Sequence, residues 1–184
     1  MFNLMRTKWI AEQFRLFKNL KGQTLREVKL WEMAFIEEGP SKKPLWAVPS
    51  LPFRQFIGIF LFLENREIYG IGTCQNGDSW GLINSFLDKY LDPAEEWAKP
   101  DSIYRVGDSD AFPVGLISDV KIFQNEKSDI SCLYLTINGH KIALQAGEVY
   151  ENSDGTLCVV KDDESILYFS KPEDISTIDF DTYY

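Results

Sequence analysis

The sequence predicts an α+β protein in which an antiparallel sheet packs with an N-terminal helix and one mid-chain helix, and in which the second half is mostly β. Its 184 residues are 45% hydrophobic, enough for the chain to collapse around a core. Apolar residues take helical spacing in two places, whereas the second half consists of short alternating runs separated by turn residues. The length suits a single domain over residues 1–184.

The first predicted element is an amphipathic helix that ends at Gly22. Its apolar residues recur mostly at steps of three or four, which places them on one face: Leu4, Trp9, Ile10, Phe14, Phe17 and Leu20. Thr24–Phe35 follows as a half-buried strand. Four prolines then fall between Glu37 and Pro52, and because proline has no amide hydrogen, this segment is predicted to be an extended loop.

The middle of the chain predicts a hairpin followed by a helix. Phe56–Leu63 and Ile68–Thr73 are apolar runs on either side of a polar turn. Trp80–Tyr90 has apolar residues at helical spacing behind an Asp or Ser cap, so a second helix is expected there. Ala94–Asp110 is predicted to be a polar connector with one helical turn around Trp97.

The second half predicts a succession of strands. Asn138-Gly139 between two alternating runs is a strong hairpin signal, because both residues adopt positive φ at low cost. Asp154-Gly155 predicts another tight turn, and Lys161–Glu164 a polar one. The expected strands are Gly115–Gln124, Ser131–Ile137, Lys141–Ala146, Val149–Tyr150, Leu157–Val160 and Ile166–Phe169.

A weak internal repeat links the two halves. Leu25–Trp31 resembles Ile117–Phe123, and a hairpin follows each segment. Two interpretations stay open: a diverged duplication with halves of about 1–110 and 111–184, or the chance likeness of alternating strands.

Candidates for catalysis are few. The chain has one histidine, His140, and no phosphate-binding loop, dinucleotide fingerprint or zinc-protease motif. We therefore expect no enzyme, no cofactor and no metal site. The three cysteines fit no disulfide framework, and the longest apolar run, Phe56–Leu63, is far shorter than the roughly 20 residues of a spanning helix. A cytoplasmic protein with reduced thiols and no membrane association is expected.

Charge is the sharpest signal in the sequence. The net charge of -9 and the sequence pI near 4.7 argue against nucleic acid as a partner, since phosphates require basic neutralisation. Residues 1–29 hold seven basic and two acidic side chains, residues 30–147 ten and sixteen, and residues 148–184 two and ten. Most of the net negative charge therefore lies in the last 37 residues.

This acidic third has two interpretations. One is solubility alone. The other is recognition of a basic protein partner, in which carboxylates steer the encounter and aromatic residues anchor the complex. The predicted partner-binding residues are Trp80, Asp154, Asp162, Asp163, Glu164, Glu173 and Asp174.

The strand-rich acidic second half, with Gly147–Tyr150 and Asp162–Phe169, resembles immunity proteins of bacterial polymorphic-toxin and contact-dependent inhibition systems. That resemblance implies a protein that binds and neutralises a cognate toxin domain, often a basic nuclease, by occluding its active surface. A small-molecule-binding or regulatory α+β domain is the alternative. An enzyme that uses paired carboxylates comes third.

Overall fold

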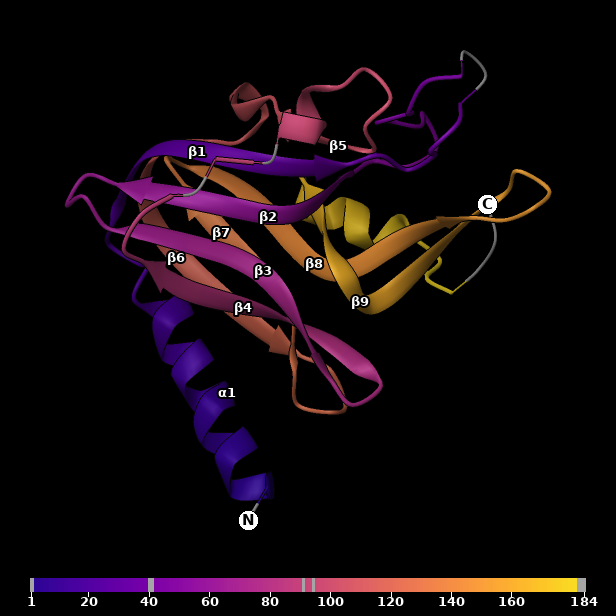
Figure 1. Ribbon diagram of the computed structural model, residues 1–184. Coiled ribbons are helices and arrows are strands. Elements are labelled where there is room, and N and C mark those ends of the chain that lie inside the picture. Colours follow the sequence, from indigo (N-terminus) through magenta and orange to yellow (C-terminus); the bar gives the residue numbers. More distant parts are fainter. Residues whose placement is uncertain (1, 40–41, 91, 94, 182–184) are drawn as a thin grey trace.

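The computed structural model describes residues 2–39, 42–90, 92–93 and 95–181. These residues form one α-helix, nine strands and three short 3-10 helices (Figure 1). In chain order they are α1 (Phe2–Lys18), β1 (Thr24–Met33), β2 (Arg54–Leu63), β3 (Ile68–Asn76), β4 (Ser79–Leu87), η1 (Glu95–Ala98), β5 (Tyr104–Gly107), η2 (Ser109–Ala111), β6 (Gly115–Gln124), β7 (Ile130–Ile137), β8 (His140–Glu151), β9 (Leu157–Phe169) and η3 (Pro172–Thr177).

The strands form one antiparallel sheet that closes on itself. Its order is β4-β3-β2-β9-β8-β7-β6-β1-β5, and β1 also pairs with β2. Six strands, β1, β2, β9, β8, β7 and β6, therefore form a closed ring. Strands β3 and β4 continue the sheet from β2 and also contribute side chains to the main core, and β5 pairs with β1. Each of the six ring strands contributes side chains to the main core, as do Phe17 and Leu20 of α1. A second apolar cluster lies under the proline-rich connection and η3.

These findings confirm the α+β class, the N-terminal helix and the β-rich second half. The predicted hairpin at Asn138-Gly139 is confirmed, with φ of 49° and 82° at the two turn residues. The hairpin of β2 and β3 is also as predicted, and η1 supplies the helical turn around Trp97.

The predicted mid-chain helix over Trp80–Tyr90 is wrong. This segment is β4, which pairs with β3 through nine consecutive residue pairs. The cause lies in the loop before it: Gly77 has a φ of 71°, as the first central residue of a type II′ turn requires, so Gly77 and Asp78 make a tight hairpin rather than a helix cap. Spacing alone did not distinguish the two structures, because a short apolar run suits either.

The polar turn predicted at Lys161–Glu164 is also wrong. The two strands expected on either side of it are one strand, β9, just as the strands expected at Lys141–Ala146 and Val149–Tyr150 are both part of β8. The polar residues instead form an irregularity, because Ala146 pairs with Ile166 whereas the next residue, Gly147, pairs with Lys161. This irregularity accommodates the polar residues 162–164 without ending the strand.

The repeat predicted from the sequence falls on equivalent strands. Strands β1–β4 and β6–β9 are two antiparallel meanders, and the pairs β1–β2 and β6–β7 share one register, with irregularities at the same two points. The meanders meet where Thr24 pairs with Leu116, and each of these residues directly precedes its copy of the repeat. This arrangement is what a local twofold axis between β1 and β6 produces. Divergent duplication stays a prediction.

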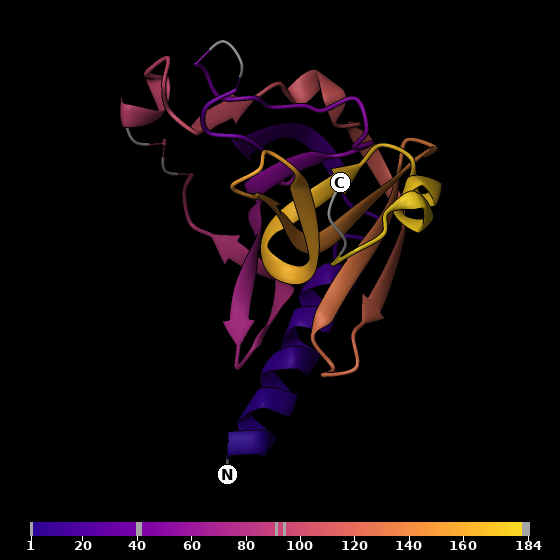
Figure 2. The ribbon, with the colours of Figure 1, turned by 90° about the vertical axis from the view of Figure 1, so that its right-hand side faces the viewer.

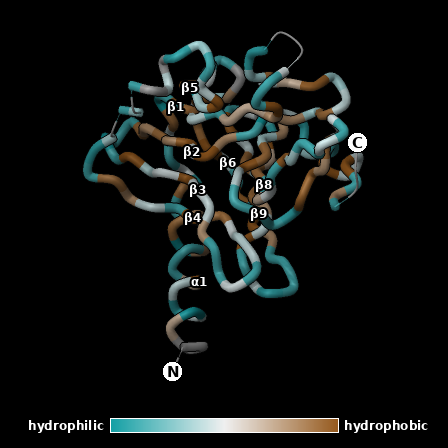
Figure 3. Tube along the Cα trace, turned by 45° about the vertical axis from the view of Figure 1, so that its right-hand side comes forward, coloured by the Kyte–Doolittle hydropathy of each residue, from teal (hydrophilic) through white to brown (hydrophobic). Residues whose placement is uncertain are grey.

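Helix α1 projects from the sheet (Figures 1 and 2). Its C-terminal half is anchored, with Phe17 fully buried, whereas Met5 and Trp9 near its start are 66% and 40% exposed. The Gln13 side chain lies at the free edge of β4, where its Oε1 accepts a hydrogen bond of 2.7 Å from the backbone N–H of Asn84. Hydrophobic residues are concentrated in the strands, whereas α1 is largely hydrophilic (Figure 3). None of the described helices has the length and apolarity needed to cross a membrane.

Candidate acidic pocket

An acidic hollow lies where the connection between β1 and β2 meets the end of β8. It encloses about 520 Å³. All of its charged described lining residues are acidic, and its remaining lining is largely apolar or aromatic. The lining consists of Met33, Ala34, Phe35, Glu37, Glu38, Ile103, Glu148, Val149, Tyr150 and Glu151.

The proline-rich connection forms one wall of this pocket because it is fixed to the sheet. Ile36 makes an isolated antiparallel bridge with Leu45, and the buried Phe35 ring packs edge-on against Phe53 at 5.5 Å. Prolines reduce the number of conformations of the loop, so these few contacts suffice to hold it. The opposite wall is the end of β8, a regular strand.

Glu148 is the buried carboxyl of the pocket. It is only 3% exposed, and its Oε2 accepts a 3.0 Å hydrogen bond from the Ser165 hydroxyl. Burial raises the pKa of Glu148 to about 7, the Ser165 hydrogen bond opposes this rise, and repulsion from Glu164 and Asp163 adds to it. No basic side chain of the described residues forms an ion pair with Glu148, whose Oε1 accepts no hydrogen bond from them.

Aromatic side chains border the pocket. Tyr150 is 41% exposed, and its hydroxyl donates a 3.1 Å hydrogen bond to Asp163. Burial and the nearby carboxylates of Glu148 and Asp163 raise the pKa of Tyr150. Tyr104, which stacks on Trp97 at 5.3 Å, also has a raised pKa, through burial and then through Glu148, Glu164 and Glu37. Two half-exposed phenols therefore lie in the field of these carboxylates.

Two arginines on the strands that pair with β1 already form ion pairs with a residue of β1. Glu32, fully buried, accepts 2.7 Å and 2.6 Å ion-pair contacts from Arg54 and Arg105. Arg105 also lies over the Trp46 ring at 4.1 Å. The two arginines carry one positive charge more than Glu32 neutralises, but neither forms an ion pair with Glu148.

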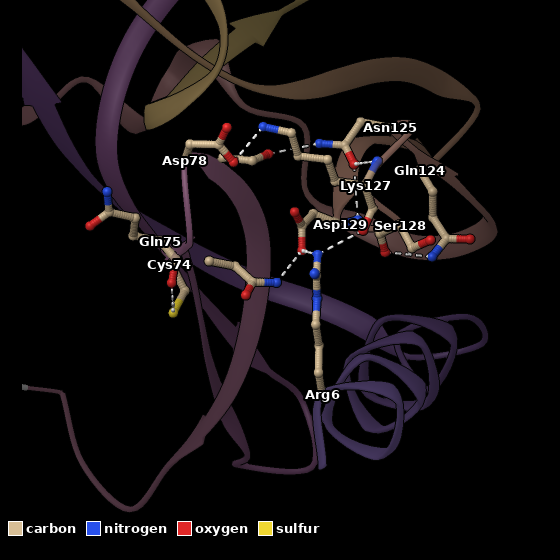
Figure 4. A network of polar contacts seen from close by, with 11 residues as sticks. Arg6, Cys74, Gln75, Asp78, Gln124, Asn125, Lys127, Ser128 and Asp129 are labelled. Atoms are coloured by element: carbon tan, nitrogen blue, oxygen red, sulfur yellow. Dashed lines mark hydrogen bonds and ion pairs between the residues drawn. The ribbon is translucent and has the colours of Figure 1, made fainter. Parts of the chain in front are cut away.

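The junction related to the acidic pocket by the local twofold has a different set of polar contacts (Figure 4). There the connection between β6 and β7 meets the hairpin of β3 and β4, and Asp129 is the buried carboxylate, at 3% exposure. Arg6 of α1 pairs with its Oδ1 at 3.1 Å, and the Asn76 amide donates to the same oxygen at 2.8 Å. Lys127 and Asp78 form a further pair at 2.6 Å. This side of the molecule supplies its own cation, whereas the acidic pocket does not.

The predicted partner-binding residues fall in several places. Asp163 and Glu164 lie beside Glu148, close enough to raise its pKa. Asp162 faces away from them and accepts a hydrogen bond from the Ser131 hydroxyl. The others lie elsewhere: Asp154 in the loop between β8 and β9, Glu173 and Asp174 in η3, and Trp80 at the start of β4.

Sequence reasoning missed the pocket residues Glu37, Glu38 and Glu148 as site members. One signal could have identified Glu148: it is a charged residue within the apolar run that ends at Val149, and β8 is continuously buried there. A carboxyl inside such a run needs either a partner or a function.

The chain matches no protein-family model, no curated protein and no solved structure.

Cys132 and His140 do not line the acidic pocket. Burial raises the pKa of the Cys132 thiol to about 12, which disfavours the nucleophilic thiolate. His140 is exposed at the start of β8. Among the described residues, no three His, Cys, Asp or Glu side chains come together as a metal site.

Proposed function

We propose that this chain is a non-enzymatic binding protein that neutralises a basic protein partner by occluding its active surface, in the manner of the bacterial immunity proteins it resembles. The observation that carries the proposal is the acidic pocket, a cavity in which the buried Glu148 has no cation among the described residues. A buried carboxyl without a cation costs stability, and a protein keeps such a cost where a ligand compensates for it.

The composition of the surface supports a protein as that ligand. Exposed tyrosine beside carboxylates is typical of interface anchors, because aromatic rings bury a large area while the charges set association rate and specificity. The net charge of -9 would draw a basic partner from a distance and repel nucleic acid.

The proposal is tested by capture. The full-length chain, tagged and immobilised, is mixed with the purified, inactivated product of the adjacent gene at low and at high salt. We expect a complex that forms faster at low salt and that protects cells from the active partner when both are co-expressed. A neighbouring product that does not bind, or that kills cells equally with and without this chain, would contradict the proposal.

A small-molecule-binding or regulatory domain is the second candidate, since 520 Å³ lies within the usual range of ligand pockets. Its acidic lining would select an organic cation. A polyamine that raises the melting temperature of the chain, together with no captured protein, would favour this candidate.

A further inference from the structure

We propose that the acidic pocket receives an arginine side chain of the protein partner, whose guanidinium pairs with Glu148. This inference rests on the proposed function and specifies the chemistry of its contact.

The first argument is the unused bonding capacity of Glu148. Its side chain is almost completely buried and lines the pocket, and Ser165 occupies Oε2 alone. Among the described residues, no hydrogen-bond donor contacts Oε1 and no cation pairs with the carboxylate. A guanidinium in the pocket would supply both in one group, because its planar fork offers several N–H donors.

The second argument is the comparison between the two sides of the local twofold. Asp129, as buried as Glu148, takes Arg6 of the same chain as its counter-ion. Glu148 lies on β8 rather than in a connection, so it is not the repeat equivalent of Asp129, but it borders the corresponding junction of the other meander and has no arginine partner among the described residues. One of these junctions therefore pairs a buried carboxylate with an arginine of the same chain, although Asp129 Oδ2 has no hydrogen-bond partner within the described part of the chain, and the arginine that pairs with Glu148 is the partner's.

The third argument selects arginine among cations. Glu37, Glu38 and Glu151 surround the pocket, so an anion is excluded by repulsion. The described residues provide no cluster of metal ligands. The Tyr150 ring, 41% exposed at the wall, offers a face on which a guanidinium stacks more favourably than an ammonium.

The test uses a probe that needs no partner. The isotope-labelled full-length chain is titrated, above neutral pH, with arginine capped at both ends by N-acetyl and N-methylamide groups, and amide shifts are followed by NMR. Capped citrulline, which has the same shape without the charge, and capped lysine serve as matched probes. We expect saturable shifts centred on Ala34, Val149 and Tyr150 with capped arginine, weaker shifts with capped lysine, and none with capped citrulline.

The decisive variant is Glu148→Gln, which keeps the shape of the side chain and removes its charge. It should weaken the binding of capped arginine by about tenfold or more, the equivalent of one charge-assisted hydrogen bond. Glu126→Gln, an exposed glutamate outside the pocket, should leave the affinity unchanged. Shifts spread over the acidic surface, equal binding by Glu148→Gln, or equal binding of capped citrulline or capped lysine would overturn the inference. If the titration fails but a partner is captured, the proposed function stands and the arginine contact is rejected. If the titration succeeds but no partner is captured, the pocket binds a guanidinium and the proposed function is rejected.

Discussion

Replacing Glu148 by glutamine should stabilise the folded protein, and should do so more strongly as the pH rises. In the folded chain, burial raises the pKa of Glu148 from 4.5 to about 7. The folded state therefore keeps a proton that the unfolded state loses, so the stability of the wild-type protein falls as the pH rises from the unfolded pKa to the folded one. Glutamine is neutral throughout and removes this dependence.

The size of the effect follows from the shift. One pKa unit corresponds to about 1.4 kcal/mol, so the full shift is worth about 3 kcal/mol above neutral pH. At about pH 5 the wild-type protein has already lost part of this stability. The difference in unfolding free energy between Glu148→Gln and wild type should therefore grow by about 2 kcal/mol between about pH 5 and about pH 8. Glutamine also still accepts the Ser165 hydrogen bond through its amide oxygen.

The assay is urea denaturation of wild type and Glu148→Gln at a series of pH values, with Glu126→Gln as the control. The free-energy difference between the control and wild type should stay constant across the series. A Glu148→Gln difference that does not change with pH, or a variant less stable than wild type at about pH 8, would show that the buried Glu148 carboxyl does not destabilise the folded protein.

Three further expectations follow from the same structure. Binding of capped arginine should weaken as the pH falls through about 7, by up to about tenfold per unit, because the pKa of Glu148 is about 7 and its proton must leave first; a pH series of NMR titrations measures this, and a constant affinity would speak against Glu148 as the contact. Gly147→Ala should destabilise the fold by about 1–3 kcal/mol in urea, because the added Cβ would lie 2.7 Å from a carbonyl oxygen of β9; an unchanged midpoint would show that the strand irregularity adapts freely. Glu32→Gln should cost about 2 kcal/mol or more, since it leaves Arg54 and Arg105 without their buried counter-ion, while their exposures of 21% and 42% limit the loss; a neutral result in the same assay would mean that water replaces the ion pairs.

Local signals in the sequence predicted much of the fold. Asn138-Gly139 specified its own turn, because few residues adopt positive φ at low cost. The alternation in Leu25–Trp31 and Ile117–Phe123 placed both segments as strands, and their likeness anticipated the shared register. Turns and strands whose conformation depends on local backbone preferences could therefore be predicted from the sequence pattern.

Features that depend on a partner strand were harder to predict. Trp80–Tyr90 has spacing that suits a helix, and only its pairing with β3 makes it β4. Lys161–Glu164 looked like a turn, yet β8 holds it within one strand. The intrinsic preference of a short segment is weak, so tertiary pairing overrides it.

The pocket could be predicted only in part. The sequence indicated an acidic C-terminal third, and two of its predicted residues, Asp163 and Glu164, lie beside Glu148. Glu37 and Glu38 come from a connection more than a hundred residues earlier, and their proximity to β8 depends on the closure of the ring. Charge counted along a chain does not show which carboxylates are buried together.

The most direct test of the account is the dissociation constant of the complex with the neighbouring gene product, measured by calorimetry for wild type, Glu148→Gln and Glu126→Gln. We expect Glu148→Gln to bind at least about tenfold more weakly although it is the more stable protein, because truncating one member of a buried charge pair is costly. Glu126→Gln should bind like wild type. Equal affinity of all three proteins would contradict the claim that the acidic pocket is where this chain holds its partner.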